Sequence, residues 1–112
     1  MRTEVHAGFK KQVRRSSIYI KWLENLQDYQ ARARILTRVE RLAAENSGDS
    51  RFLGDISELR INYGPGYRIY FKDTGKEIIV LLCGGDKTSQ QEDIAKARKI
   101  AQFYDEEDGY EN

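Results

Sequence analysis

One stretch, residues 57–83, limits the folds open to this 112-residue chain more than any other. Polar and apolar residues alternate over 57–63 and again over 67–72, which is the pattern of strands that turn one face toward a core. Gly64-Pro65-Gly66 separates the two runs and predicts a type II turn, because proline presets the first central position and glycine supplies the positive φ of the second. The strand expected over 77–83 is apolar from residue 78 onward, as in a central strand buried on both faces.

Helical spacing of apolar residues marks two segments before these strands and one after them. The first covers 17–26, and the second runs from about 29 to 46 with Asp28 as its N-cap. Their connection is so short that we expect an antiparallel helical hairpin. An S-x-x-E capping box at Ser89 opens the last helix. This helix is predicted to end near Tyr104.

The predicted order is helix, helix, three antiparallel strands, helix, with a short leading strand near 12–16 that joins the sheet. This is an α+β fold, an N-terminal helical hairpin packed on a small antiparallel sheet with a C-terminal helix. The length suits one domain, which we place at 12–104. Residues 1–11 are expected to form a flexible extension, residues 105–112 an acidic tail, and residues 51–55 a loop.

The formal net charge is only +1, but the charges are unevenly distributed. Residues 105–112 hold five acids and no base, so residues 1–104 carry 19 Lys/Arg against 13 Asp/Glu, a net charge of +6. A basic body with an acidic tail fits a phosphate-binding surface. Ordinary solvated charge on helix faces explains the same counts equally well.

The cysteine and histidine content gives little support for a disulfide or a metal site. Cys83 is the single cysteine, which excludes an internal disulfide, and its apolar surroundings favour a buried, inert thiol. Together with the one histidine, His6, it falls short of the roughly three or four ligands of a zinc site, so we expect no metal and no cofactor. No run approaches the roughly 20 apolar residues of a membrane span. The first residues lack the apolar segment of a secretory signal, so we expect a cytoplasmic protein.

The polar face of the predicted hairpin gathers the residues best suited to chemistry, namely Glu58, Arg60, Arg68, Tyr70 and Lys72. Arginine binds phosphate through two parallel charge-assisted hydrogen bonds and stays charged at any working pH. Tyrosine offers a plane on which an unpaired base can stack. We therefore predict a surface for a phosphodiester. The alternative is an exposed sheet face that carries ordinary cross-strand ion pairs.

The loop Gly84-Gly85-Asp86-Lys87 follows the central strand and leads into the last helix. Free backbone amides at a helix N-terminus favour an anion, so this loop is a second candidate for phosphate binding. It lacks the G-x-x-x-x-G-K-[ST] spacing of a P-loop. A plain strand-to-helix turn with a solvated lysine is the alternative.

Four segments carry a more specific signal: WLENL at 22–26, QARARI at 30–35, ELRINYGPGYRIYF at 58–71 and GDKTSQ at 85–90. Together they resemble the HigB-like addiction-module killer proteins of the RelE/ParE toxin superfamily, over about residues 12–104. The resemblance implies a toxin that enters the ribosomal A site and cleaves the exposed mRNA. In this reaction the ribose 2′-hydroxyl attacks its own phosphate, and the reaction needs no metal.

The resemblance also implies roles for individual residues. Arg68 matches the arginine that stabilises charge on the transferring phosphate, and Arg60 matches a basic residue used for phosphate contact or leaving-group stabilisation. Lys87 falls where relatives carry another basic residue, and Tyr104 is the candidate for an aromatic residue near the C-terminus. We place these four residues with Glu58 in the candidate catalytic set.

Glu58 departs from the pattern of RelE, which has lysines in this strand. Some relatives, such as YoeB, use a glutamate as general base, and Glu58 is a candidate for that role. A salt bridge to Arg60 or Arg68 is the alternative. We predict that Tyr70 and Lys72 on the neighbouring strand bind RNA.

Two other functions stay open at this point. A ParE-type inhibitor of DNA gyrase shares the fold without a nuclease site, and a non-catalytic interaction module shares it without any activity. The resemblance implies a helix-turn-helix antitoxin, the ribosome and mRNA as partners. We predict an mRNA endoribonuclease of a type II toxin–antitoxin system.

Overall fold

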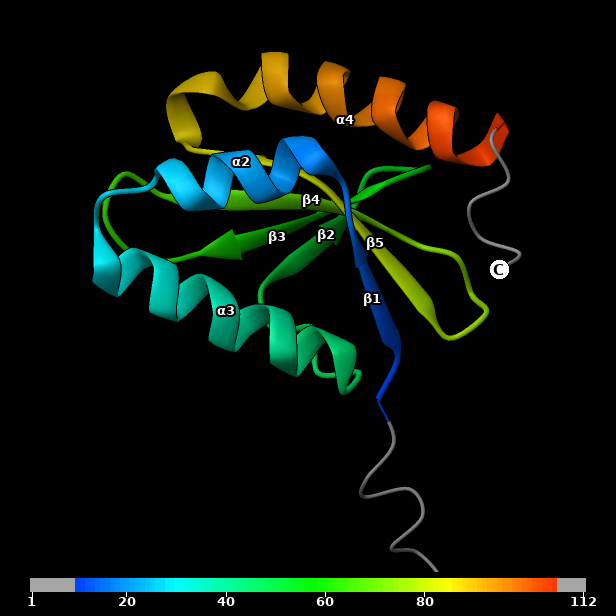
Figure 1. Ribbon diagram of the computed structural model, residues 1–112, viewed down its shortest axis with the longest axis horizontal. Coiled ribbons are helices and arrows are strands. Elements are labelled where there is room, and N and C mark those ends of the chain that lie inside the picture. The colour runs from blue at the N-terminus through cyan, green and yellow to red at the C-terminus, as the bar shows by residue number, and fades with distance from the viewer. Residues whose placement is uncertain (1–9, 107–112) are drawn as a thin grey trace, which may run out of the picture.

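The computed structural model describes residues 10–106 (Figure 1), so residues 1–9 of the expected extension and 107–112 of the expected tail lie outside it. In chain order the elements are β1 (Gln12–Arg15), α2 (Ser17–Asn25), α3 (Tyr29–Ala43), β2 (Ser50–Phe52), β3 (Ser57–Ile61), β4 (Tyr67–Asp73), β5 (Ile78–Gly85), the 3₁₀ turn η1 (Lys87–Ser89) and α4 (Gln90–Glu106).

The five strands form one sheet in the order β1-β5-β4-β3-β2. The three strands from β3 to β5 are antiparallel neighbours, as predicted from the alternating pattern, and the mixed α+β class is confirmed. β1, however, pairs in parallel with β5, from Gln12 opposite Ile78 to Arg15 opposite Leu81. Because β5 is buried on both faces, it needs a neighbour on each side, and β1 fills the second place.

The short leading strand predicted near residues 12–16 is confirmed as β1. The description of the domain as one that opens with a helical hairpin is wrong. A strand comes first, and the helices follow it, so the domain begins inside the sheet. The prediction of a wholly antiparallel sheet is wrong for the same reason. β2 was also missed: residues 51–55 were expected to be a loop, but Ser50–Phe52 pairs with β3 as the edge strand.

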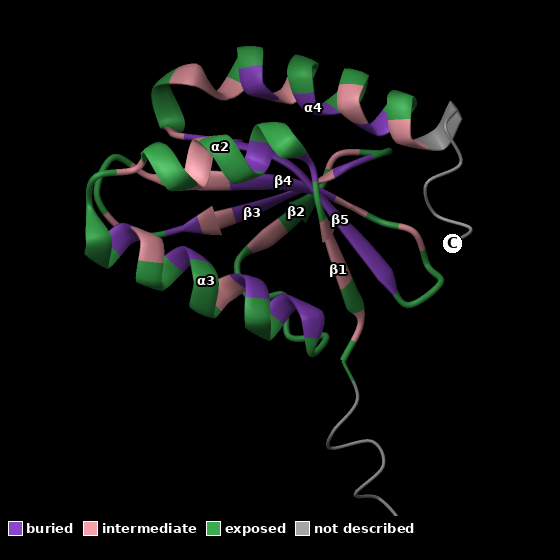
Figure 2. Cartoon of the chain, in the orientation of Figure 1, coloured by how far each residue is buried: buried purple, intermediate pink, exposed green. Residues whose placement is uncertain are grey.

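The sheet lies between two layers of helix (Figure 1). One face packs against α2 and α3, and the core there is built from one side of the hairpin, including Leu59, Ile61, Ile69 and Phe71, which were predicted to be core. The other face packs against α4, with the second core between them. Figure 2 shows buried positions running along β4 and β5, between the two layers. This second layer decides which residues of the hairpin reach solvent.

Side-chain caps begin the helices. Ser16 accepts a hydrogen bond from the Tyr19 amide (2.9 Å) at the start of α2, and Asp28 accepts from the first amides of α3, as predicted. The predicted capping box at Ser89 is displaced by one turn, because Asp86 caps η1 and Ser89 is the far member of that box. α3 ends at Ala43, three residues before the predicted end.

Gly84 and Gly85 end the central strand where both layers approach it closely. A Cβ atom at Gly84 would overlap the indole ring of Trp22 from α2, and one at Gly85 would overlap the carboxylate of Asp93 from α4. The absence of a side chain at these two positions lets α2 and α4 lie against the same end of β5.

Gly84→Ala is therefore expected to lower the free energy of unfolding by about 1–3 kcal/mol, the usual cost of overpacking a core. Urea unfolding followed by circular dichroism measures this change. Lys76→Ala in the exposed β4–β5 turn is the control and should stay within about 0.5 kcal/mol of the wild type. Equal stability of the Gly84 variant and the wild type would contradict this account of the packing.

Candidate functional site

Arg60 of β3 and Arg68 of β4 are direct cross-strand partners, which puts their Cα atoms about 5 Å apart. Both side chains, together with Lys87 of η1, line a groove of about 320 Å³ beside the β3–β4 turn. The full lining is Asp49, Arg60, Ile61, Asn62, Gly64, Pro65, Gly66, Arg68 and Lys87. Three of the predicted catalytic residues thus come from three elements to one hollow, where cations outnumber acids.

Arg68 is held at two points. Its Nε forms an ion pair with Oε2 of Glu58 (3.4 Å) without a hydrogen bond, and its Nη1 donates a hydrogen bond to the carbonyl of Gly66 (2.9 Å). Only 12% of its side chain is exposed. A guanidinium so placed presents a fixed charge with little water around it, and such a charge interacts more strongly with an anion than a mobile surface charge does.

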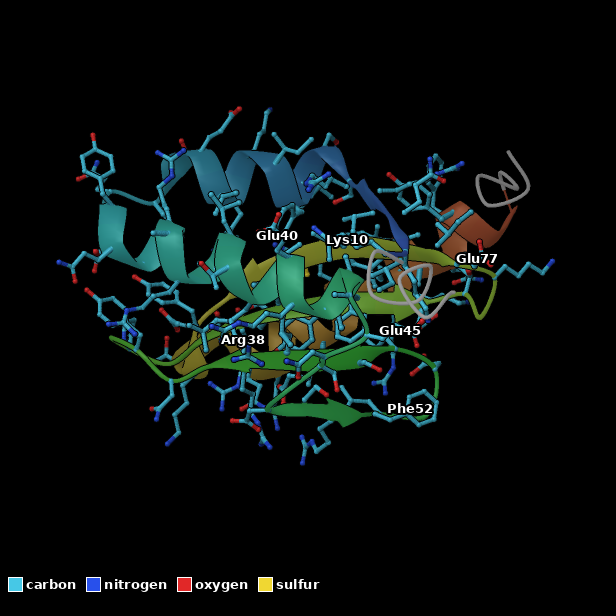
Figure 3. The ribbon with its side chains drawn as sticks, turned by 90° about the horizontal axis from the view of Figure 1, so that it is seen from below. Lys10, Arg38, Glu40, Glu45, Phe52 and Glu77 are labelled. Atoms are coloured by element: carbon cyan, nitrogen blue, oxygen red, sulfur yellow. The ribbon has the colours of Figure 1, made fainter. Side chains whose placement is uncertain are left out.

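Arg60 is more open and has a different partner. Its Nη2 and Nε lie 3.0 and 3.1 Å from Oδ1 of Asp49, and 36% of its side chain is exposed. Arg38 of α3 supports this corner by donating to the backbone carbonyls of Arg60 and Ser47, and Figure 3 shows it between α3 and the strands. The Asp49 carboxylate offsets part of the positive charge of Arg60.

The β3–β4 turn brings Arg68 and Lys87 together. The turn closes one residue earlier than predicted, through a hydrogen bond from the Gly66 amide to the Tyr63 carbonyl (3.1 Å), and Gly66 has a φ of +83°. A Cβ atom there would lie 3.3 Å from Nη1 of Arg68 and 3.6 Å from Cβ of Lys87. Glycine at this position therefore serves both the backbone conformation and the close approach of the two cationic residues.

Glu58 and Tyr70 are buried, which contradicts the prediction of an exposed polar face. Both are 0% exposed because the start of α4 covers this part of the sheet. The Tyr70 hydroxyl donates to Oε2 of Glu58 (3.2 Å), and burial beside this carboxylate raises the pKa of Tyr70. Tyr70 therefore has no free ring face on which a base could stack, and the Glu58 carboxylate is closed off from the groove.

Two more predicted residues do not line the groove. Lys72 lies four residues beyond Arg68 in β4, roughly 13 Å along the strand. Tyr104 lies near the C-terminal end of α4, roughly 20 Å along the helix from its first residue, Gln90. There Tyr104 packs against the second core. The structure thus brings Arg60, Arg68 and Lys87 together and leaves these two apart.

The loop after β5 does not offer the open amides that were predicted. The carboxylate of Asp86 accepts hydrogen bonds from the Thr88 amide (2.8 Å) and from the Thr88 hydroxyl (2.6 Å). The hydrogen bond from the Thr88 hydroxyl, and then those from the backbone amides of Thr88 and Ser89, hold the pKa of Asp86 below its ordinary value. An internal carboxylate thus occupies the position proposed for an external anion, and Lys87 is the part of the loop that lines the groove.

Four contributors to the site were not predicted from the sequence. Asp49 and Arg38 were assigned to a loop and to a helix surface, and Gln90, which donates to Glu58 (2.8 Å), was part of an ordinary first turn. The role of Asn62 in the lining was also missed. Of the four, Asn62 alone had a sequence signal, because it lies two residues before the G-P-G turn. The other three act through contacts between distant parts of the chain.

Residues 10–106 contain no group of three or more His, Cys, Asp or Glu side chains that could hold a metal ion. They also contain no helix long and apolar enough to cross a bilayer. Cys83 is buried, as predicted, and its burial and the nearby Asp93 raise the pKa of the thiol to about 12.

Comparison with known proteins now adds to this geometry. No family model matches the sequence. A Haemophilus influenzae protein, described as uncharacterized, is 41% identical over 92 residues, which cover 81% of this chain and 93% of that protein. The chain belongs to the family of this Haemophilus protein.

The fold of this family member is that of the toxin RelE. The solved structure of an E. coli RelE toxin with two arginine-to-alanine substitutions, in the free state, superposes with a TM-score of 0.67. The match covers 80% of this chain and 96% of that one at 14% sequence identity, so it shows the fold alone. The predicted RelE-like fold is confirmed, while the HigB-like assignment stays a prediction.

The raised pKa of Cys83 makes a direct prediction. A pH of 8 is far below the thiol pKa of about 12, so almost none of the folded protein carries Cys83 as the reactive thiolate. We expect Cys83 in the folded protein to resist a disulfide reagent such as dithionitrobenzoate at pH 8. In 6 M guanidinium chloride it should react fully, because the unfolded thiol has the ordinary pKa of about 8.5. Rapid stoichiometric labelling of the folded protein would contradict the buried placement of this residue.

Proposed function

We propose that this protein is the toxin of a type II toxin–antitoxin system and acts as a ribosome-dependent mRNA endoribonuclease in the cytoplasm. The observation that carries the proposal is the cross-strand pair Arg60–Arg68, which lines one groove together with Lys87. The RelE fold supports it, because a known toxin has the same arrangement of strands and helices.

The chemistry proposed is an internal transfer of the phosphoryl group. The 2′-oxygen loses its proton to a water molecule and bonds to the adjacent phosphorus, the bond from phosphorus to the 5′-oxygen breaks, and that oxygen takes a proton from water. The products are a 2′,3′-cyclic phosphate and a 5′-hydroxyl. Negative charge increases on the phosphate oxygens in the transition state, so fixed cations beside them lower the barrier.

The three cationic residues suit different parts of this reaction. Arg68, held at two points, is placed to stabilise the phosphate oxygens through its remaining N–H groups. The more exposed Arg60 is suited to contact a phosphate at the edge of the groove. Lys87 is exposed on η1 and is suited to stabilise the leaving 5′-oxygen. Glu58 is not assigned as general base, because a fully buried carboxylate cannot contact the 2′-hydroxyl.

The proposed partners follow from the same surface. An antitoxin silences the protein if it covers the groove or the surface that docks on the ribosome. We propose a small helix-turn-helix protein in this role, by resemblance to HigB-like systems. Acidic side chains or an ordered segment over Arg60 and Lys87 would compete directly with the RNA backbone.

The test is to map RNA 5′ ends in cells that express the protein and in a reconstituted translation reaction. We expect new 5′-hydroxyl ends within translated codons, and none in the absence of ribosomes. Arg68→Lys keeps a positive charge beside Glu58 but loses the planar fork, and it should slow cleavage by roughly 100-fold or more. Arg60→Ala should weaken RNA contact and also reduce cleavage.

Arg98→Ala is the matched control, since this arginine pairs with Asp55 away from the groove (3.0 Å). It should cut RNA as the wild type does. Growth arrest with intact mRNA and blocked DNA supercoiling would replace the proposal with gyrase inhibition. Absence of any growth arrest or cleavage would favour a non-catalytic module of the same fold.

A further inference from the structure

We propose that Glu58 is a positioning residue, whose buried carboxylate fixes the orientation of the Arg68 guanidinium at the edge of the groove. Tyr70 and Gln90 complete the arrangement by fixing the carboxylate itself. The kinetic consequence of this inference rests on the proposed function, whereas the structural part stands on the contacts alone.

The carboxylate of Glu58 has a well-defined set of donors. Oε2 accepts hydrogen bonds from Tyr70 (3.2 Å) and from Nε2 of Gln90 (2.8 Å), and it lies 3.4 Å from Nε of Arg68. The other oxygen, Oε1, has no hydrogen bond and lies 3.9 Å from Nε of Arg51. Three groups from β4 and α4 therefore converge on a single oxygen atom of a residue in β3.

Burial makes this set of contacts costly to disturb. Glu58 is 0% exposed, and a carboxylate removed from water needs donors or a cation beside it. The same face of the sheet also carries apolar residues of the second core, among them Ile56, Val80 and Leu82. Apolar side chains in place of the whole Glu58–Arg68 pair would fill the same space, and buried ion pairs contribute little to stability compared with such replacements. Stability alone therefore gives little reason for an ion pair here.

The orientation of Arg68 does give such a reason. A guanidinium has five N–H groups in a rigid plane, and two anchor points fix that plane. In Arg68 these are Nε, which faces Glu58, and Nη1, which donates to the carbonyl of Gly66. The contact of Nε with Glu58 is an ion pair without a hydrogen bond. Apart from the Nη1 bond to Gly66, the N–H groups of Arg68 have no hydrogen-bond partner within residues 10–106, and the residue lines the groove. Glu58 thus holds one edge of the plane and leaves the opposite edge for an anion.

Gln90 adds a link between the groove and α4. It is the first residue of that helix, and its amide reaches across to β3. The position of α4 is in this way coupled to the orientation of Arg68 through one carboxylate. Tyr70 supplies the second fixed donor, from the strand that carries Arg68 itself.

The experiment compares Glu58→Gln with the wild type in the full chain. The substitution keeps size and hydrogen-bonding capacity but removes the charge that holds Arg68. The first readout is the Nε–H signal of Arg68 in ¹H–¹⁵N NMR spectra, assigned by its loss in Arg68→Lys. We expect hydrogen exchange at this group to be faster by about tenfold in Glu58→Gln, because the buried negative charge beside the guanidinium is lost.

The second readout is cleavage in a reconstituted translation reaction. We expect kcat to fall by roughly 10- to 100-fold, as for a misplaced catalytic group, while KM changes little. The pH profile of kcat should keep its shape. A general base in this position would instead lose the acidic limb of the profile on substitution, which would overturn the proposal.

Arg51→Gln is the matched control, because it removes the cation beside the other oxygen of the same carboxylate. It should change neither the Arg68 signal nor kcat. Tyr70→Phe and Gln90→Ala serve if Glu58→Gln fails to fold. Each removes one donor to Oε2, and each should reduce kcat without moving the pH profile.

The outcomes separate the two claims. If the wild type cuts no RNA, the proposed function fails, and the Arg68 signal still decides whether Glu58 holds the guanidinium. An unchanged Arg68 signal in Glu58→Gln, Tyr70→Phe and Gln90→Ala overturns the positioning role. A changed signal with wild-type kcat shows a structural contact without catalytic value and also overturns it.

Discussion

The burial of β5 on both faces is the constraint from which the rest of the structure follows. All eight residues of this strand are buried, so each face needs its own layer of helix and each edge needs a neighbouring strand. α2 and α3 cover one face, α4 covers the other, and β1 and β4 occupy the two edges. The apolar run in the sequence thus requires the three layers seen in Figure 1.

The candidate site lies at the part of the sheet that α4 does not cover. The start of α4 covers Glu58 and Tyr70, and the next cross-strand pair, Arg60 and Arg68, reaches the groove beyond it. The same sheet face therefore holds a buried carboxylate and, one pair further along, a pair of cationic residues. The buried carboxylate of Glu58 contacts one side of the Arg68 guanidinium, and the other side is open to a ligand in the groove.

How far the sequence predicts this structure depends on the range of the interactions involved. Alternation over 57–63 and 67–72 identified β3 and β4, and the apolar residues of one hairpin face were correctly assigned to the core, because these signals are local. β2 was missed, since three residues show no period. Alternation separates two faces of a strand but does not reveal that a helix covers the polar one. Glu58 and Tyr70 were therefore expected in solvent.

The candidate site shows the same division. Arg60, Arg68 and Lys87 were identified from the sequence, because the hairpin register and the end of β5 bring them together. Arg38, Asp49 and Gln90 were not, because each acts across 11 to 32 residues of chain through a contact that has no sequence period. Predictions from local pattern thus reach the cationic groups but not the groups that orient them.

The parallel pairing of β1 with β5 has a consequence for the order of assembly. Gln12 meets Ile78 across nearly the whole domain, so the first strand to leave the ribosome waits for the last strand before it can join the sheet. Contacts of such long sequence separation form late, because the entropy of closing the chain is lost before they are made. A nascent chain therefore cannot complete its sheet until β5 has been synthesised.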